Sequence, residues 1–429
     1  MLPVLYAPLC LGLGAVLSPV APPEALVLES VRIAAPGSAA STAPRSILIV
    51  RGAIVSIEDD LEAPAGARVV DARGLFVAPG FYDMHVHLPG PNEDVPAYFV
   101  GPALDMMLEH GITTARVGRG APRHLDLRAR IERSEVRGPR LLISAPPLSR
   151  SRFPSLDEAR SLFRIQRAQG YDFVKFLSAP ESLFERGATP CYADYVHAAR
   201  DAGLDFVGHV PRTPEGARVD LCALPGQASV EHASALSVLL ECPPHERATV
   251  FAALARERVA LDLNLEYYAM ISGMEPLDAL LERPELGRLP REVLDAWTED
   301  RRRPDPRRAL RRRLVEGIAP LGAELRAAGV PLVLSASVGP FLAPGACYVR
   351  EARRTLELGY APTEILAMAT IEAARVCGDD TLRGTVEIGK VADLVLLGSD
   401  PLESVEALAD VARTLVGGRV VYVDPQRVR

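Results

Sequence analysis

Two histidines, His85 and His87, stand at the end of the apolar run 74–84. Side chains at positions i and i+2 of a β-strand point to the same side, so both imidazoles can bind one metal ion. A His-x-His pair alone occurs often by chance, but further residues that can bind metals follow on short apolar segments of the same kind. These residues are Lys175, His209 and His232. Their recurrence on similar segments predicts a metal centre.

Lys175 lies inside the apolar segment 173–176, and the chain has only one other lysine among its 48 basic residues. A charged amine is costly to bury, and arginine is the usual cation of this chain. One interpretation is a buried lysine that pairs with a carboxylate. The other is that this position needs a primary amine, because reaction with carbon dioxide gives a carbamate whose two oxygens can bridge two cations.

A single histidine on an apolar strand is usually a core residue, and each of these four has that alternative interpretation. Four histidines at matching strand ends favour metal binding instead. The remaining histidines lie on helical or loop stretches, and we expect them at the surface or in packing. They are His110, His124, His197 and His245.

The segments that must position these residues are short apolar stretches, mostly separated by spacers long enough for a helix. They lie at residues 81–88, 113–118, 140–145, 173–176, 205–210, 229–233, 260–265 and 332–337. Eight strands that alternate with helices are typical of a (β/α)8 TIM barrel, which carries its active site at the carboxyl ends of the strands. The sequence pattern instead predicts short β-strands in residues 25–79 and 383–429. We therefore expect an α/β protein with the barrel at residues 80–382 and a small β-sandwich built from the N- and C-terminal segments.

The composition limits the classes of partner. The net charge of −7 and the pI near 5.7 argue against a nucleic-acid partner. The arginine-rich stretch 301–313 is locally basic, and we expect a solvated helix face or a loop insertion there because acidic residues surround it. The six cysteines contain no Cys-x-x-Cys motif, so neither a disulfide scaffold nor a cysteine-ligated zinc site is expected.

Residues 1–24 are mostly apolar and rich in proline, and the first 20 carry no charged side chain. They are too short and too interrupted by proline to predict a stable membrane span. Their length fits a signal peptide, but they lack a positively charged amino-terminal region and a recognisable cleavage site. The alternative is an apolar extension that does not direct export. A signal peptide would place the protein in the periplasm or outside the cell, and an extension would leave it in the cytoplasm.

Taken together, the motifs resemble those of the amidohydrolase superfamily, nearest to the branch with imidazolonepropionase-like and prolidase-like enzymes. The segments that carry the resemblance are 79–87, Lys175, 208–211, 230–232 and 389–395. The resemblance implies a barrel with an appended β-sandwich, and one or two divalent cations, zinc foremost, that serve hydrolysis of a small amide or peptide-like substrate. It also implies a role for each residue of the site: ligands of the first ion at His85 and His87, a bridging carbamate at Lys175, and ligands of the second ion at His209 and His232.

The chain departs from this family pattern at strand 8, which normally ends in an aspartate. Here the apolar run 330–336 leads to Ser337. The aspartate would bind a metal and take a proton from the attacking water, and a general base of this kind contributes about 10²–10⁴-fold in rate. We therefore keep two hypotheses. The chain is a metal-dependent amidohydrolase that breaks an amide, cyclic amide or peptide C–N bond through a metal-bound hydroxide, or it is a catalytically impaired relative that binds a small molecule or a partner.

A substitute for the missing aspartate is suggested by segment 261–266, where leucines alternate with polar residues. A strand here would place Asp262, Asn264 and Glu266 on one side, with Glu266 near the mouth of the barrel. We hypothesise that Glu266 takes part in proton transfer. The alternative is a polar layer that lines the substrate pocket or supports the structure.

Overall fold

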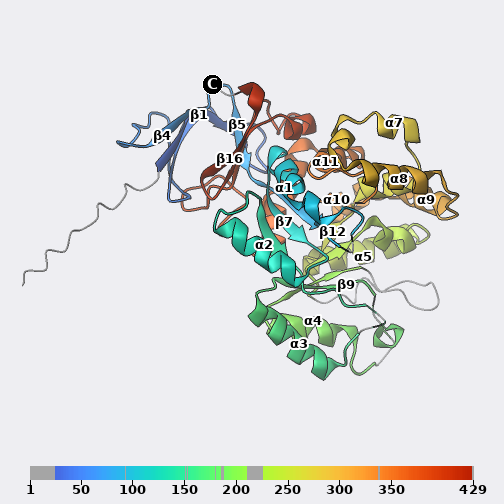
Figure 1. Ribbon diagram of the computed structural model, residues 1–429. Helices are drawn as coiled ribbons and strands as arrows, with labels where there is room; N and C mark the ends of the chain where they lie inside the picture. The colour runs from blue at the N-terminus through green and yellow to red at the C-terminus, as the bar shows by residue number, and fades with distance from the viewer. Residues whose placement is uncertain are drawn as a thin grey trace, which may run out of the picture.

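The computed structural model describes residues 25–91, 93–149, 151, 153–178, 180–184, 188–209, 226–336 and 339–427. An eight-stranded sheet and a larger α/β unit make up this part of the chain (Figure 1). The expected signal peptide or extension at 1–24, and Ser337, lie outside the described residues.

The eight-stranded sheet joins segments from both ends of the described chain. Its strands are β1 (Ala25–Ile33), β2 (Pro44–Val50), β3 (Ala53–Glu58), β4 (Arg68–Asp71), β5 (Phe76–Pro79), β14 (Leu394–Leu397), β15 (Val411–Val416) and β16 (Arg419–Val423). The order is β16-β15-β14-β5-β1-β2-β3, and β4 also pairs with β1. The junction is the antiparallel β14–β5 ladder, in which Leu394 lies opposite Pro79.

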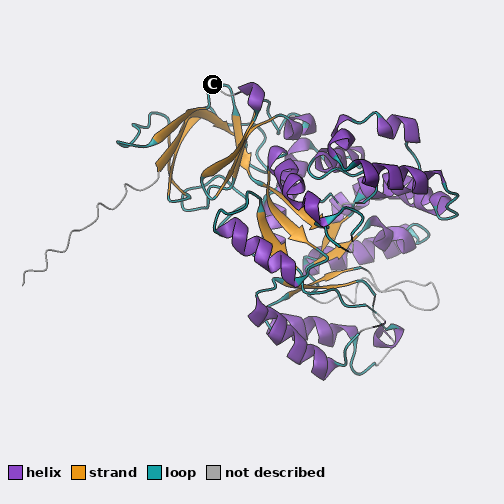
Figure 2. Ribbon diagram, viewed as in Figure 1, coloured by secondary structure: helices purple, strands orange, loops and turns teal. Residues whose placement is uncertain are grey.

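Figure 2 shows this sheet at one end of the molecule, next to the helical part. Its core consists of buried aliphatic side chains such as Leu28, Ile47, Ile49 and Leu396. The ladders connect all eight strands into one sheet, so the two facing sheets of the expected sandwich stay unconfirmed. The predicted domain boundaries likewise remain predictions.

The α/β unit contains a strand at each of the eight segments predicted from the sequence. They are β6 (Phe81–Val86), β7 (Ile112–Val117), β8 (Arg140–Ile143), β9 (Phe173–Phe176), β10 (Asp205–Gly208), β11 (Ser229–Glu231), β12 (Ala260–Asp262) and β13 (Leu332–Val333). All neighbouring strands run parallel, in a sheet of order β6-β7-β8 and a sheet of order β13-β12-β11-β10-β9.

Contacts at both edges link these parallel sheets. Ser144, just after β8, forms a parallel bridge with Phe173 of β9. At the other edge, the main-chain nitrogen of Met84 donates a hydrogen bond to the carbonyl oxygen of Leu334 over 3.2 Å. The ladders of the described chain form two sheets and not one continuous cylinder, so the closed barrel stays a prediction.

Helices lie around the parallel strands (Figure 1). The α-helices are α1 (Val100–Glu109), α2 (Pro122–Glu132), α3 (Leu156–Gln169), α4 (Tyr192–Asp201), α5 (Pro244–Glu257), α6 (Leu265–Ser272), α7 (Leu277–Leu281), α8 (Arg291–Arg302), α9 (Arg308–Ile318), α10 (Leu321–Ala328), α11 (Ala346–Glu357), α12 (Pro362–Ala369) and α13 (Ile371–Val376). In α3 the local sequence explains where the helix begins and ends. Ser155 and Glu158 form a capping box at its start, and Gly170 ends it in the left-handed conformation.

The arginine-rich stretch falls on the end of α8, a turn and most of α9, as a solvated helix face would. Arg311 pairs with Asp305 over 2.5 Å, and Arg301 donates to the carbonyl oxygen of Met270 over 2.8 Å. Among the described helices, none combines the length and the apolar character needed to cross a bilayer.

Candidate metal centre

The carboxyl ends of the parallel strands bring the predicted ligands together. His85 lies in β6, Lys175 in β9, and His209 and His232 directly follow β10 and β11. The ring centroids of His85 and His232 are 4.7 Å apart, and those of His209 and His232 are 4.8 Å apart. The Nζ of Lys175 lies 2.9 Å from the Nε2 of His85. All five residues predicted to bind metal, His87 included, therefore belong to one cluster.

The His85–His87 pair has the geometry expected for chelation by an i, i+2 pair on a strand. The two Nε2 atoms lie 3.2 Å apart. Two nitrogens that bind one tetrahedral zinc ion at about 2.0–2.1 Å are separated by about 3.3 Å. The pair is therefore spaced for a single ion without movement of the backbone.

The other histidines occupy the positions expected of surface or packing residues. His197 and His245 are exposed. His124 is buried in the packed face of α2, and the Nδ1 of His110 lies 2.8 Å from the carbonyl oxygen of Met106.

Glu231, the last residue of β11, is a central member of the cluster that sequence reasoning missed. Its Oε2 lies 2.6 Å from the Nζ of Lys175 and 3.2 Å from the Nδ1 of His85. Its Oε1 accepts a hydrogen bond from Arg116 over 3.0 Å. Lys175 thus has the carboxylate partner that one of the two interpretations required. The available signal was an acidic residue on an apolar strand, directly before His232.

Arg116 was also missed, although it interrupts apolar β7 in the way that Lys175 interrupts β9. Its guanidinium is buried and donates to the carbonyl oxygen of Met84 over 2.7 Å and to the Oγ of Ser229 over 3.0 Å. With its bond to Glu231, Arg116 ties β6, β7 and β11 together beneath the histidines.

Two buried aspartates complete the cluster. Asp262, at the end of β12, places its Oδ2 3.6 Å from the Nδ1 of His85. Asp83, in β6, accepts hydrogen bonds from the main-chain nitrogens of Ala336 over 2.8 Å and of His85 over 3.3 Å. Asp83 therefore holds the segment after β13 against the His-x-His motif.

The predicted alternation through Glu266 is wrong, because β12 ends at Asp262 and α6 begins at Leu265. The carboxylate of Glu351 accepts hydrogen bonds from the main-chain nitrogens of Leu265 and Glu266 over 2.8 and 2.7 Å. These bonds satisfy free donors at the start of a helix and so favour a helix over a longer strand.

Glu266 consequently does not share a strand face with Asp262. Its two carboxylate oxygens pair with Arg283 over 3.1 Å and with Arg354 over 3.2 Å. These contacts favour the alternative interpretation, a polar group that supports the structure. Its predicted part in proton transfer remains untested.

Burial and mutual charge set the protonation of the cluster. Burial lowers the pKa of His85, His87 and His232 well below its usual value, which keeps their imidazoles neutral and able to bind metal. Burial alone would raise the pKa of Glu231, but the charge of Lys175 foremost, with that of Arg116, outweighs burial and holds this pKa well below its usual range. Glu231 is therefore an anion.

Burial shifts the protonation equilibria of Lys175 and Asp262 toward their neutral forms. Burial lowers the pKa of Lys175, and the nearby charge of Glu231 opposes the shift. Burial, together with the charge of Glu231, raises the pKa of Asp262 to about 6. A lysine with a lowered pKa has more of the neutral amine that carbamate formation requires.

The residues present fit a divalent cation. Ligand atoms of His85, Glu231 and His232 all lie within 4.8 Å of one another. Buried polar atoms without a hydrogen-bond partner in the described part of the chain include His232 Nδ1 and Asp262 Oδ2. Buried polar atoms without partners are unusual, and imidazole with carboxylate is a donor set that zinc, iron and manganese accept.

Gly118, directly after β7, provides the space in which Lys175 lies. A Cβ at this position would be 2.9 Å from the Nζ of Lys175 and 3.5 Å from the Nε2 of His85. Any larger residue would therefore displace the amine of Lys175.

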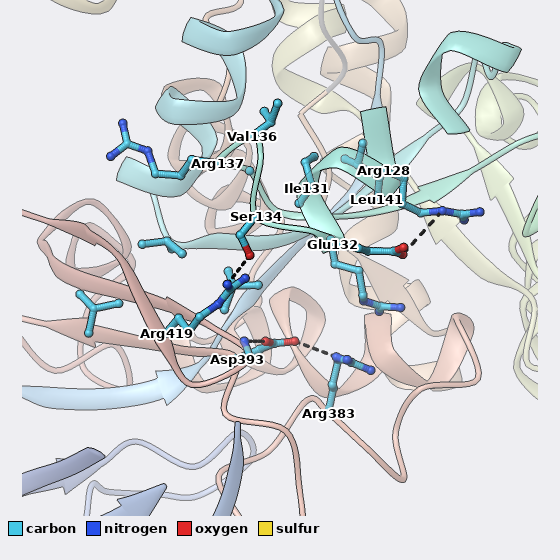
Figure 3. Close-up of a pocket in the computed structure, with 16 residues that line it drawn as sticks. Arg128, Ile131, Glu132, Ser134, Val136, Arg137, Leu141, Arg383, Asp393 and Arg419 are labelled. Atoms are coloured by element: carbon cyan, nitrogen blue, oxygen red, sulfur yellow. Dashed lines mark hydrogen bonds and ion pairs between the residues drawn. The ribbon is translucent and has the colours of Figure 1, made fainter. Parts of the chain in front are cut away.

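A separate cavity of about 580 Å³ lies between the α2–β8 region and the β15–β16 turn (Figure 3). None of the predicted metal ligands lines it. Its polar groups pair with one another: Arg383 with Asp393 over 2.7 Å, and Arg419 with Ser134. This cavity is therefore distinct from the metal centre, and its arginines have partners already.

Comparison of the sequence with known proteins agrees with the geometry. The profile of the amidohydrolase family matches residues 76–421. A dihydroorotase of Geobacter sulfurreducens is 59% identical over 46 residues, which make up 11% of this chain and 11% of that protein. The chain thus matches about a tenth of the length of this curated relative.

Comparison of the fold extends over nearly the whole chain. A prolidase solved in complex with N-methylphosphonate-L-proline has a TM-score of 0.71 at 20% identity, covering 93% of this chain and 100% of that chain. A Xaa-Pro dipeptidase with methionine bound in its active site has a TM-score of 0.69 at 17% identity, covering 94% and 100%. At these identities the likeness shows the fold alone, an α/β TIM-barrel-like arrangement.

Proposed function

The chain belongs to the amidohydrolase family, and from this premise we propose that it is a metal-dependent hydrolase of carbon–nitrogen bonds. Its substrate in this proposal is a small molecule with an amide, a cyclic amide or a peptide bond. The observation that carries the proposal is the cluster at the strand ends, in which the Nε2 atoms of His85 and His87 lie 3.2 Å apart beside Glu231 and His232. The likeness to prolidases supports closure of the two parallel sheets into a barrel.

The proposal gives each side chain a task. His85 and His87 would hold one ion with neutral imidazoles, and His209 and His232 would hold a second. A divalent cation bound there, zinc foremost, would polarise the scissile carbonyl and activate the attacking water. Burial in the cluster excludes bulk water, which strengthens every charge interaction with the substrate.

Lys175 is carboxylated in this proposal. The carbamate would be an anion beside Glu231, and the cluster tolerates two such anions only when metal ions replace the ammonium as the positive partners of Glu231. Without ions, the contact of 2.6 Å with Glu231 favours the ammonium form of Lys175. Metal loading and carboxylation are therefore coupled.

The alternative is a catalytically impaired relative that binds a small molecule or a partner. Two observations favour it: Ser337 stands where the family pattern has an aspartate, and the Lys175–Glu231 ion pair satisfies the amine without a metal. If a Ser337→Asp variant gained hydrolysis of an amide or peptide substrate, the chain would be an enzyme that lost activity with its aspartate.

The first experiment measures metal content by plasma mass spectrometry after growth with zinc and bicarbonate. Lys175→Ala is compared with Lys390→Ala, which removes the chain's other lysine, whose Nζ donates to the carbonyl oxygen of Asp380 far from the histidines. We expect about two equivalents in the wild type and the Lys390 variant, and a loss in the Lys175 variant. A metal content near zero in all three proteins would refute the hypothesis of a metal-dependent hydrolase and favour the hypothesis of a binding protein.

Activity is then assayed with Xaa-Pro dipeptides and with dihydroorotate, the substrates suggested by the names of the similar proteins. Hydrolysis of either that depends on added metal supports the proposal. Bound metal without hydrolysis of any amide, cyclic amide or peptide in a wider panel would favour the impaired relative.

A further inference from the structure

Asp262 contacts two of the metal-binding histidines through different atoms. Its Oδ2 lies 3.6 Å from the Nδ1 of His85, and its carbonyl oxygen accepts a hydrogen bond from the main-chain nitrogen of His232 over 2.6 Å. The opposite carboxylate oxygen, Oδ1, accepts hydrogen bonds from the side chains of Asn264, over 3.0 Å, and of Ser335. The carboxylate is therefore held on one side and directed at His85 on the other.

The orientation of the His85 ring assigns a role to each of its nitrogens. Nε2 faces the Nε2 of His87 at 3.2 Å and the Nζ of Lys175 at 2.9 Å, which is the side of the predicted metal ligands. Nδ1 faces the carboxylates of Glu231 at 3.2 Å and Asp262 at 3.6 Å. A histidine that binds metal through Nε2 must carry its proton on Nδ1, and a carboxylate at Nδ1 stabilises that tautomer.

The two carboxylates at Nδ1 differ in their other partners. Glu231 already contacts two cations, Arg116 over 3.0 Å and Lys175 over 2.6 Å. Within the described residues, the ion-pair contact of Asp262 is with His85 alone. The free carboxylate oxygen of Asp262, Oδ2, is thus directed at the imidazole of His85.

We propose that Asp262 is a positioning residue of the metal centre, which directs its carboxylate at the Nδ1 of His85 and so holds His85 in its Nδ1–H tautomer. The role proposed for Asp262 is to orient His85 and not to bind the ion. The effect on metal affinity rests on the proposed function, whereas the effect on the tautomer does not need a bound metal.

The test compares the full-length wild type with Asp262→Asn, which keeps the shape of the side chain and removes its charge. The matched control is Asp393→Asn, because Asp393 is also a buried aspartate but pairs with Arg383 and with the main-chain nitrogen of Gly417, away from the histidines. The His85 tautomer is read from ¹⁵N ring shifts of the histidine-labelled, metal-free protein. Zinc affinity is read by competition with a chromogenic chelator.

We expect the Nδ1–H form of His85 to predominate in the wild type and in the Asp393 control, and to give way to a tautomer mixture in Asp262→Asn. Zinc affinity should fall by about 10–100-fold in Asp262→Asn and stay near the wild-type value in the control. Ser335→Ala, which frees one side of the carboxylate but keeps its charge, should shift the tautomer in the same direction by less, and provides the test if Asp262→Asn does not fold.

The inference would be overturned if Asp262→Asn or Ser335→Ala kept the wild-type ring shifts and bound zinc within about two-fold of the wild-type affinity. In that case a wild type that binds zinc and hydrolyses amides would leave the proposed function intact. A wild type that binds no zinc but shows the tautomer shift in Asp262→Asn would instead refute the proposed function and leave the positioning role in place.

Discussion

The Nζ of Lys175 lies 2.6 Å from the Oε2 of Glu231, and both side chains are almost fully buried. The other oxygen of Glu231 accepts a hydrogen bond from Arg116, so one anion connects two buried cations of β7 and β9. Charges in such a place are stable only as a set, because each lost partner leaves an uncompensated charge in a medium of low polarity. The effects of substitutions in the centre should therefore be strongly coupled.

Arg116→Met should lower the free energy of unfolding by about 3–5 kcal/mol, because it leaves Glu231 with one cation and removes three hydrogen bonds. Adding Glu231→Gln should cost less than the sum of the two single changes, since the amide needs no cation on that side. Urea denaturation of the four proteins of this double-mutant cycle measures the coupling. Strictly additive free energies would contradict the paired arrangement.

Gly118→Ala should weaken zinc binding and lower the stability by about 1–3 kcal/mol, because the new methyl group would lie 2.9 Å from the Nζ of Lys175. Gly101→Ala is the matched control, since a Cβ at that helical position meets no atom within 4 Å. Zinc content and thermal unfolding are measured on both variants. If the two variants behave alike, Gly118 is not what makes room for Lys175.

Glu266→Gln should destabilise the protein by about 3 kcal/mol and leave kcat of the folded protein unchanged, because its carboxylate serves two ion pairs, with Arg283 and Arg354. Denaturation curves and kcat on a substrate found in the screen separate the two effects. A drop in kcat of about 100-fold or more with little loss of stability would restore the predicted role in proton transfer.

His124 should make the protein less stable in acid. Burial, aided by the charge of Arg123, lowers its pKa to about 4 in the folded protein, against about 6.5 when unfolded. The unfolded chain then binds the proton first, so this contribution to stability is complete above pH 6.5 and is lost as the pH falls toward 4. The loss is at most about 3 kcal/mol. His124→Phe should flatten the dependence of unfolding free energy on pH between these values, and an unchanged slope would show that His124 is not responsible.

The sequence by itself determined where the strands are and which residues end them. Apolar runs of four to eight residues and their spacing are local properties, so all eight parallel strands lie at the predicted segments. The same reasoning selected His85, His87, Lys175, His209 and His232, because a polar residue within or directly after an apolar segment can be recognised from the sequence alone.

Only the tertiary structure decided how the charges of the site are compensated. Arg116 and Glu231 are 115 positions apart, and their contact depends on β7 and β11 facing the same interior. The end of β12 was decided in the same way: Leu261 to Glu266 alternates like a strand, but the carboxylate of Glu351, 86 positions from Leu265, binds the free main-chain donors and starts α6. A local pattern predicts which face of an element is buried, whereas the partner that satisfies a buried charge or a free N–H group comes from a distant segment that the pattern does not contain.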